Sequence, residues 1–214
     1  MRAYAGYLFD LDGTLVDTAA DLNAALNHVL GRAGLAAVDE VHTRHWVGHG
    51  AKVLIEEALA SQNQPRQRAE SMFDVFIDYY HRHVADLSRP YPHVVDALDA
   101  LRARGARLAV VTNKREGLSR SLLDALDLSR RFDCLIGGDT AARPKPAADP
   151  ALLACERLGL TPRDVLFVGD STTDVGCARA AGCDVVCVPD GYNHGTPAHE
   201  LGADAVIDSF LTLV

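Results

Sequence analysis

The spacing of hydrophobic residues changes along the chain and divides it into two parts. Residues 3–9 form a short apolar run, which predicts a buried strand. In the next part, hydrophobic residues recur at helical spacing over 22–30, 46–60 and 66–87, and no segment between 18 and 87 has the pattern of a strand. We therefore expect a block of helices inserted directly after the first strand.

A different rhythm begins at residue 94, where short runs rich in β-branched residues alternate with helical stretches. This alternation predicts βαβ units and a parallel sheet that is buried on both faces, which is an α/β fold. The expected helices are 94–104, 116–126, 149–158 and 173–181, and the expected strands are 108–111, 134–136, 165–168, 185–188 and 205–207.

Two aspartates, Asp10 and Asp12, end the first apolar run. Along an extended chain this spacing places both carboxylates on the same side, where they repel each other. A bound cation or a shared proton would relieve that repulsion and would indicate a chemical role. The alternative is an ordinary polar turn after a buried strand, since Asp and Gly are common turn residues.

The other expected strands also end in polar residues. Because ligands of parallel α/β sheets bind beyond the carboxyl ends of the strands, these residues should meet at one edge. They are Thr112 and Asn113, Lys145 within the loop 143–146, Asp170 with the nearby Asp174, and the segment 190–195. Taken singly, Asp170 could be a helix cap, Asp174 a surface residue, Lys145 a solvated charge and Thr112–Asn113 a turn.

Together these side chains suit phosphoryl transfer. Asp10 can act as a nucleophile that accepts a phosphoryl group, and Mg²⁺ held by Asp10 and Asp170 can offset the repulsion between carboxylate and phosphate. Lys145 supplies a positive charge, and Thr112 with backbone N–H groups near Asn113 can bind phosphate oxygens. Asp12 is left to move protons. Neither a calcium-binding EF-hand loop nor a P-loop is present in the sequence.

Composition narrows the class of protein further. With 48% hydrophobic and 23% charged residues among 214, the chain reads as an ordinary globular protein. A net charge of -8 argues against a nucleic acid or an anionic membrane as partner. No apolar run approaches the length of a membrane span, and we expect no signal peptide. The five cysteines lack Cys-x-x-Cys spacing, so we expect reduced thiols in a cytoplasmic protein.

These motifs and their order resemble those of the haloacid dehalogenase superfamily. The matching stretches are Asp10-Leu-Asp12-Gly-Thr, Thr112-Asn113, Lys145-Pro146 and Gly169-Asp170-x-x-x-Asp174. The resemblance implies a Rossmann-like core, residues 1–16 and 89–214, whose five main strands, numbered in chain order, lie as 5-4-1-2-3. It also implies a helical cap domain, residues 17–88. In that family the metal is bound by side chains matching Asp10 and Asp170 and by the backbone carbonyl matching Asp12, with Asp174 beside it.

Comparison within the superfamily refines the expected activity. Dehalogenases lack an acid at the position of Asp12, and transport ATPases usually carry Thr there, so Asp12 favours a phosphatase or a mutase. Related sugar-phosphate mutases carry His where this chain has Leu22, which argues against a mutase. Three stretches, 45–51, 89–92 and 191–195, resemble those of bacterial phosphoglycolate phosphatases. His93 departs from their usual Gly, which puts the local turn in doubt.

The expected activity is hydrolysis of a small phosphorylated metabolite, with 2-phosphoglycolate as the first candidate, by a monomer or homodimer. Alternatives are a phosphatase or mutase acting on another sugar phosphate or on pyrophosphate, and a non-catalytic module that has kept the fold. Gly48, His49 and Gly50, with Lys52 or Arg44 nearby, could meet the substrate carboxylate, because glycine permits close approach of the backbone. The other interpretation of this stretch is a glycine-rich helix start with solvated basic residues.

Overall fold

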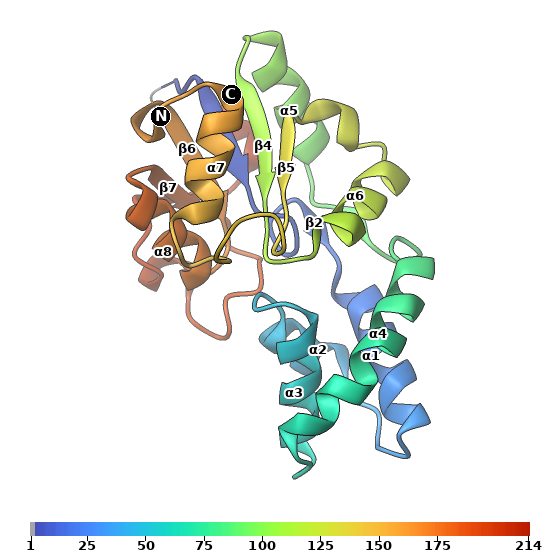
Figure 1. Ribbon diagram of the computed structural model, residues 1–214. Coiled ribbons are helices and arrows are strands. Elements are labelled where there is room, and N and C mark those ends of the chain that lie inside the picture. The colour runs from blue at the N-terminus through green and yellow to red at the C-terminus, as the bar shows by residue number, and fades with distance from the viewer. Residues whose placement is uncertain (1–2) are drawn as a thin grey trace.

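A parallel sheet forms the centre of one half of the computed structural model, which describes residues 3–214 (Figure 1). The first two residues of the expected core lie outside this range. The expected order of the five main strands is confirmed, and a further strand extends the sheet beyond them. The strands are β1 (Gly6–Phe9), β4 (Arg107–Val111), β5 (Cys134–Ile136), β6 (Val165–Gly169), β7 (Asp184–Cys187) and β8 (Ala205–Val206), in the order β5-β4-β1-β6-β7-β8.

Helices cover both faces of this sheet. They are α5 (Val94–Ala103), α6 (Glu116–Ala125), α7 (Asp149–Leu158) and α8 (Thr172–Ala181). Alternation along β1 shows the division: Tyr7 and Phe9 share a hydrophobic cluster with residues of α5 and α6, whereas Leu8 belongs to the cluster of α7 and α8. The sheet is therefore buried on both faces, as the apolar runs predict.

The helical block consists of α1 (Ala19–Arg32), α2 (Glu40–Trp46), α3 (Ala51–Ser61) and α4 (Ala69–Arg82), and it lies beyond the carboxyl ends of the strands (Figure 1). The single helix expected over 46–60 is wrong at its start, because residues 47–50 form a turn. Gly48 and Gly50 adopt φ of 126° and 90° there, which only glycine accommodates readily. The third helix ends at Arg82 rather than at 87.

Two passages of the chain join the helical block to the sheet, and they lie side by side. Strands β2 (Val16–Asp17) and β3 (Arg89–Pro90) form an antiparallel pair that the sequence pattern does not reveal. The buried carboxylate of Asp21 accepts hydrogen bonds from the backbone N–H of Leu87 and Ser88. These bonds fix the returning chain against the start of α1.

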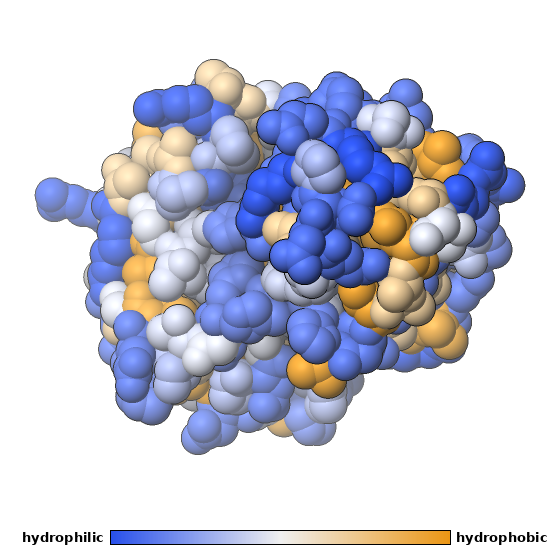
Figure 2. Space-filling view, turned by 90° about the horizontal axis from the view of Figure 1, so that it is seen from below, coloured by the Kyte–Doolittle hydropathy of each residue, from blue (hydrophilic) through white to orange (hydrophobic). Residues whose placement is uncertain are grey.

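Short 3₁₀ helices complete the structure, and His93 precedes α5 in a left-handed conformation with φ of 64°. A glycine would adopt this angle with less strain, so His93 affects the geometry of the turn before α5. Viewed from the side of the helical block, the surface is mostly hydrophilic, with separated apolar patches (Figure 2). Within residues 3–214, no helix has the length and apolar character required to cross a bilayer. The 3₁₀ helices are Arg66–Arg68, Ser129–Arg131, Pro162–Asp164, Ala198–Glu200 and Phe210–Leu213.

Candidate active site

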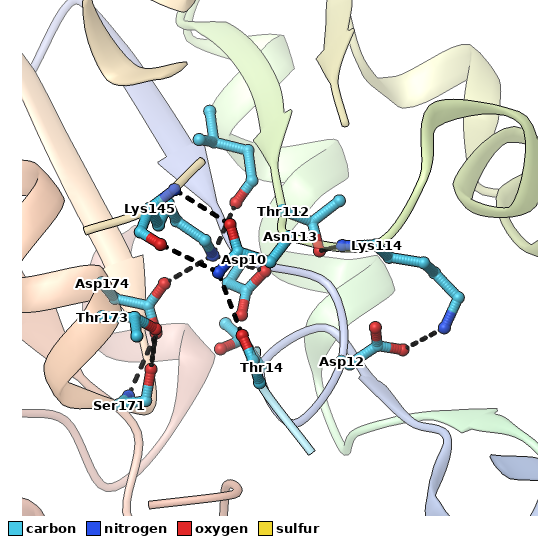
Figure 3. Close-up of polar contacts among 12 residues, drawn as sticks. Asp10, Asp12, Thr14, Thr112, Asn113, Lys114, Lys145, Ser171, Thr173 and Asp174 are labelled. Atoms are coloured by element: carbon cyan, nitrogen blue, oxygen red, sulfur yellow. Dashed lines mark hydrogen bonds and ion pairs between the residues drawn. The ribbon is translucent and has the colours of Figure 1, made fainter. Parts of the chain in front are cut away.

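A buried lysine, Lys145, forms the centre of a charge cluster at the carboxyl edge of the sheet (Figure 3). Its Nζ lies 2.8 Å from Asp10 Oδ1 and 2.7 Å from Asp174 Oδ1, and donates to the Val111 carbonyl at 3.0 Å. Burial alone would lower the pKa of Lys145, but the two carboxylates outweigh it and raise that pKa. Lys145 is therefore a fixed positive charge beside Asp10.

Asp10 follows β1 directly, and its own N–H donates to the Val168 carbonyl of the neighbouring strand. Burial raises the pKa of this carboxyl to about 7, against the lowering effect of Lys145, and the nearby Asp174 raises it further. Although Lys145 lies close, Asp10 Oδ1 accepts no aligned hydrogen bond from any described residue. An additional cation at this oxygen would favour the charged, nucleophilic form of Asp10.

Three buried carboxylates, those of Asp10, Asp170 and Asp174, each place one oxygen within 4.8 Å of the others. Asp170 accepts from Thr14 Oγ1 at 2.6 Å and from the Tyr192 N–H at 2.5 Å. Burial raises the pKa of Asp170 well above its usual range, and the other two carboxylates add to the effect. An all-oxygen donor set with this excess of negative charge fits a hard divalent cation.

Asp174 is occupied by structural hydrogen bonds on both oxygens. Its Oδ1 meets Lys145, and its Oδ2 accepts from the N–H groups of Asp170 and Ser171 at 3.1 and 3.0 Å. The bond from the Ser171 N–H is one half of a capping box at the start of α8, and the Ser171 hydroxyl also donates to Oδ2. Asp174 therefore positions Lys145 and the Asp170 loop, while Asp10 keeps one oxygen, Oδ1, without an aligned hydrogen bond.

Asp12 has its own lysine partner. The chain does not stay extended after Phe9, since it turns so that the Gly13 N–H donates to the Val16 carbonyl at 2.9 Å. The Asp12 carboxylate then accepts from Lys114 Nζ at 2.6 Å (Figure 3). It also accepts from Thr18 Oγ1 at 2.7 Å. The two aspartates thus line one cavity, but different cations neutralise them.

Lys114 is a site residue that the sequence analysis does not single out. Its side chain is only 5% exposed, and its Nζ lies 4.6 Å from the centre of the Tyr80 ring in α4. Burial would lower the pKa of Lys114, but the charge of Asp12 outweighs it and raises that pKa. Burial also raises the pKa of Tyr80 to about 12, so its hydroxyl stays protonated at neutral pH. The available signals, a lysine directly after Thr112–Asn113 and a tyrosine on an apolar helix face, also fit a surface charge and a core residue.

A cavity of about 220 Å³ separates the sheet edge from the helical block. Its mixed lining combines the two aspartates with aromatic and aliphatic side chains of the block. The lining residues are Asp10, Asp12, Leu22, Val47, Gly48, His49, Gly50, Ala51, Lys52, Leu54, Phe73, Phe76, Tyr80, Thr112, Asn113, Lys114, Arg115, Leu118, Gly138 and Asp139.

The polar pair that follows β4 has two different placements. Thr112 is buried, and its Oγ1 accepts from the Lys114 N–H at 3.2 Å. The Asn113 side chain donates to the Gly48 carbonyl at 3.0 Å and to the Lys145 carbonyl at 3.1 Å, and it accepts from the Lys145 N–H. Asn113 thus joins the helical block to the loop that carries Lys145.

The glycine-rich turn of the helical block meets the 190–195 segment. His49 stacks on His194 with ring centres 4.8 Å apart, and burial together with His194 lowers the pKa of His49. Lys52 lines the cavity but is 53% exposed and pairs with Glu70. The structure thus brings the Gly48–Lys52 segment to the cavity.

Arg44, the other basic residue expected near the substrate, lies elsewhere. Its guanidinium is 2.7 Å from Asp17 Oδ2 and 2.8 Å from Glu40 Oε1, and the residue is absent from the lining of the cavity. It also lies over the Tyr192 ring, whose hydroxyl accepts from the N–H groups of Thr18 and Ala19. Arg44 therefore stabilises the junction between the helical block and the sheet.

Comparison with known proteins agrees with this architecture. A phosphoglycolate phosphatase of Agrobacterium fabrum is 43% identical over 208 residues, covering 96% of this chain and 89% of that protein. That of Escherichia coli K12 is 38% identical over 228 residues, covering 98% and 90%. A crystal structure described as a predicted phosphoglycolate phosphatase from Haemophilus somnus superposes with a TM-score of 0.91 at 34% identity, covering 98% and 96%. The family model of haloacid dehalogenase-like hydrolases matches residues 7–188, and the chain therefore belongs to this family.

Proposed function

We propose that this protein is a Mg²⁺-dependent phosphatase of small phosphomonoesters, with 2-phosphoglycolate as its substrate. The observation that carries the reaction type is Asp10 Oδ1, a buried carboxylate oxygen without an aligned hydrogen bond, beside a fixed lysine and a second buried acid. The substrate is proposed because relatives that match most of this chain at 38–43% identity are named phosphoglycolate phosphatase.

Asp10 and Asp170 would hold the metal ion with their side chains, and Asp12 with its backbone carbonyl. When bound, Mg²⁺ supplies positive charge that offsets the repulsion between the phosphate and Asp10. Asp174 keeps Lys145 and the Asp170 loop in position through the bonds described above.

In the first chemical step, a carboxylate oxygen of Asp10 forms a bond to phosphorus while the bond from phosphorus to the ester oxygen breaks. The departing oxygen takes a proton from Asp12 and leaves as an alcohol. Lys145 and the Thr112 hydroxyl stabilise the negative charge of the phosphoryl oxygens. The product of this step is an acyl phosphate on Asp10.

In the second step, Asp12 takes a proton from water as the water oxygen attacks phosphorus. The bond between phosphorus and the Asp10 oxygen breaks, which releases inorganic phosphate and restores the carboxylate. Asp12 ends the cycle protonated, as it began. The protons used in the two steps come from Asp12 and from the attacking water.

Residues 17–88 would act as a cap that closes over the substrate. The hydrogen bond from Asn113 to the Gly48 carbonyl lies between cap and core, and breaking it would accompany opening. The ligand is then a small metabolite enclosed in the cavity, which suits neither a nucleic acid nor a membrane as partner. A cytoplasmic location is proposed because four of the five cysteines are buried, unpaired thiols.

A metabolite panel tests the proposal directly. Phosphate release from 2-phosphoglycolate should exceed that from sugar phosphates and pyrophosphate in kcat/KM, should disappear with EDTA, and should return with Mg²⁺. Asp10→Asn should be inactive, whereas the matched change Asp74→Asn, at an exposed residue of α4, should retain activity. Equal activity of Asp10→Asn and the wild type would overturn the mechanism.

A mutase is the main alternative, and the same panel can score isomer formation. The position where related mutases carry His is Leu22 here, and this apolar side chain lines the cavity. We therefore expect phosphate release without isomerised sugar phosphate. Isomer formation faster than phosphate release would establish the alternative.

A further inference from the structure

The cavity contains a buried cation and a buried hydroxyl that the reaction steps do not use. Lys114, from the loop after β4, and Tyr80, from α4, line the same cavity as Asp10 and Asp12. Lys114 Nζ lies 2.6 Å from Asp12 Oδ1 and 4.6 Å from the centre of the Tyr80 ring. A group from the sheet half and a group from the helical block therefore meet beside the proton-transfer residue.

Both groups have hydrogen-bonding capacity left over. Tyr80 is fully buried, and its hydroxyl makes no aligned hydrogen bond with any described residue. An ammonium group has three N–H donors, of which Asp12 accepts one from Lys114. Buried polar groups are normally satisfied, and the same cavity is also lined by the apolar side chains of Leu22, Leu54 and Phe76. Buried donors without acceptors beside apolar side chains indicate the place of an acceptor on the ligand.

The chemistry of the proposed substrate requires an anion site at this position. In 2-phosphoglycolate a single methylene separates the ester oxygen from the carboxylate carbon. Since Asp12 protonates the ester oxygen, the cation that binds the carboxylate must be an immediate neighbour of Asp12. We propose that Lys114 Nζ and Tyr80 Oη bind the carboxylate of the leaving group; this assignment rests on the proposed phosphatase function.

Other basic residues around the cavity are less suitable. Lys52 is 53% exposed and pairs with Glu70, and Arg115 is 54% exposed and pairs with Asp139. Exposed cations bind anions weakly because water screens them, whereas a buried cation beside an apolar wall discriminates strongly between charged and neutral ligands. The site thus selects small phosphate esters with an anionic group one carbon from the ester oxygen.

Ethyl phosphate is the matched probe, because it replaces the carboxylate of 2-phosphoglycolate with a methyl group. The measured quantity is the ratio of kcat/KM for 2-phosphoglycolate to that for ethyl phosphate. We expect Tyr80→Phe to lower this ratio about tenfold and Lys114→Met to lower it about a hundredfold. Taking the ratio separates carboxylate binding from any general damage to Asp12, which would slow both substrates.

Tyr79→Phe is the control, because it removes the same hydroxyl group from the neighbouring residue. Tyr79 stacks on His28 and His83 and is absent from the cavity lining. An unchanged ratio in both Tyr80→Phe and Lys114→Met would overturn the subsite, as would a ratio lowered by Lys52→Met alone. Thermal unfolding checks that each variant folds. If Lys114→Met does not fold, Tyr80→Phe decides the question alone.

The same experiment distinguishes the two proposals. If the wild type shows no preference for 2-phosphoglycolate over ethyl phosphate, the proposed substrate is wrong and the subsite falls with it. If the wild type has the preference and the variants keep it, only the subsite is wrong. Binding of 2-phosphoglycolate to Asp10→Asn in the presence of Mg²⁺, measured by calorimetry, gives a second readout that needs no turnover and should weaken in Tyr80→Phe.

Discussion

The two lysines of the site differ in what surrounds them. Lys145 contacts Asp10, Asp174 and the Val111 carbonyl, which all belong to the sheet half of the molecule. Lys114 contacts Asp12 of the same half but lies against Tyr80 of the helical block. Both are buried and both carry a raised pKa from a partner carboxylate.

This difference separates the tasks of the two ends of the cavity. The groups around Lys145 at the phosphate end all come from the sheet half, so we expect them to keep their geometry whether or not the helical block closes. The leaving-group end around Lys114 is complete only when Tyr80 is in place. On the proposed function, chemistry common to phosphate esters belongs to the sheet half, and recognition of a particular ester depends on the helical block.

The largest expected effect on stability comes from removing the cation at the phosphate end. Lys145→Met leaves Asp10 and Asp174 buried without their partner, which should cost about 3–5 kcal/mol of stability. It should also lower kcat by roughly 10²–10³, the range for loss of one group that stabilises transition-state charge. Thermal unfolding and phosphate release measure these effects, with Lys52→Met as the control for stability. A variant as stable as the wild type would show that the cluster does not need Lys145.

Asp12→Asn breaks the other pair and removes the group proposed to transfer protons. We expect kcat for 2-phosphoglycolate to fall by roughly 10²–10⁴, the range for a general acid–base group. Mg²⁺ affinity should change little, because only the backbone carbonyl of Asp12 is proposed to meet the metal. With an aryl phosphate, whose leaving group needs no proton, rapid-quench kinetics should show normal formation of the intermediate and slow hydrolysis. Normal turnover of the alkyl ester would refute the assignment.

The phosphate end should also destabilise the metal-free protein at high pH. Asp10 has a pKa of about 7 in the folded state against an ordinary value of 3.8, so the folded state holds its proton more tightly. That stabilisation is complete below pH 3.8 and is lost as the pH rises through about 7.

In EDTA, the Tm of the wild type should therefore fall relative to Asp10→Asn as the pH rises from about 4 to about 7. The expected loss is a few kcal/mol of unfolding free energy. In a chain of this size, each kcal/mol lowers the Tm by roughly 2–4 °C. Mg²⁺ should reverse the shift at pH 8 in the wild type alone. Parallel Tm profiles for the two proteins would contradict the raised pKa.

The smallest effect is expected at His93, which lies in neither pair. His93→Gly relieves a φ of 64° but adds freedom to the unfolded chain, so the net gain should be about 1 kcal/mol or less. Differential scanning calorimetry should show a slightly higher Tm with unchanged kcat/KM. A lower Tm would mean that the weak contact between His93 and Asp96, at 3.7 Å, matters more than the backbone strain.

The contrast between the two ends explains what the sequence could predict. Asp10, Lys145 and Asp170 each follow an apolar strand or lie in the loop after one, so the rule for parallel sheets places them together. The contact between Lys114 and Asp12 spans 102 residues, and the Tyr80 contact depends on how two separate packing units meet. Periodicity carries no information about such contacts, and a tyrosine on an apolar helix face is first interpreted as core.

Errors in the helical block have a local cause. The hydrophobic spacing continues from Val47 into α3, so the turn at 47–50 is hidden, and α2 has too few buried residues to show a helical stripe. Strands β2 and β3 are two residues each, too short for a pattern. What long-range packing decides, the local pattern does not reveal.

The most direct test of the central claim is to trap the covalent intermediate. The protein would be quenched with acid during turnover of 2-phosphoglycolate labelled with ³²P, and its peptides mapped. We predict label on the peptide that contains Asp10, and none in Asp10→Asn. Steady release of phosphate by Asp10→Asn would contradict the account. So would turnover of an aryl phosphate by Asp12→Asn at the wild-type rate with no label on Asp10.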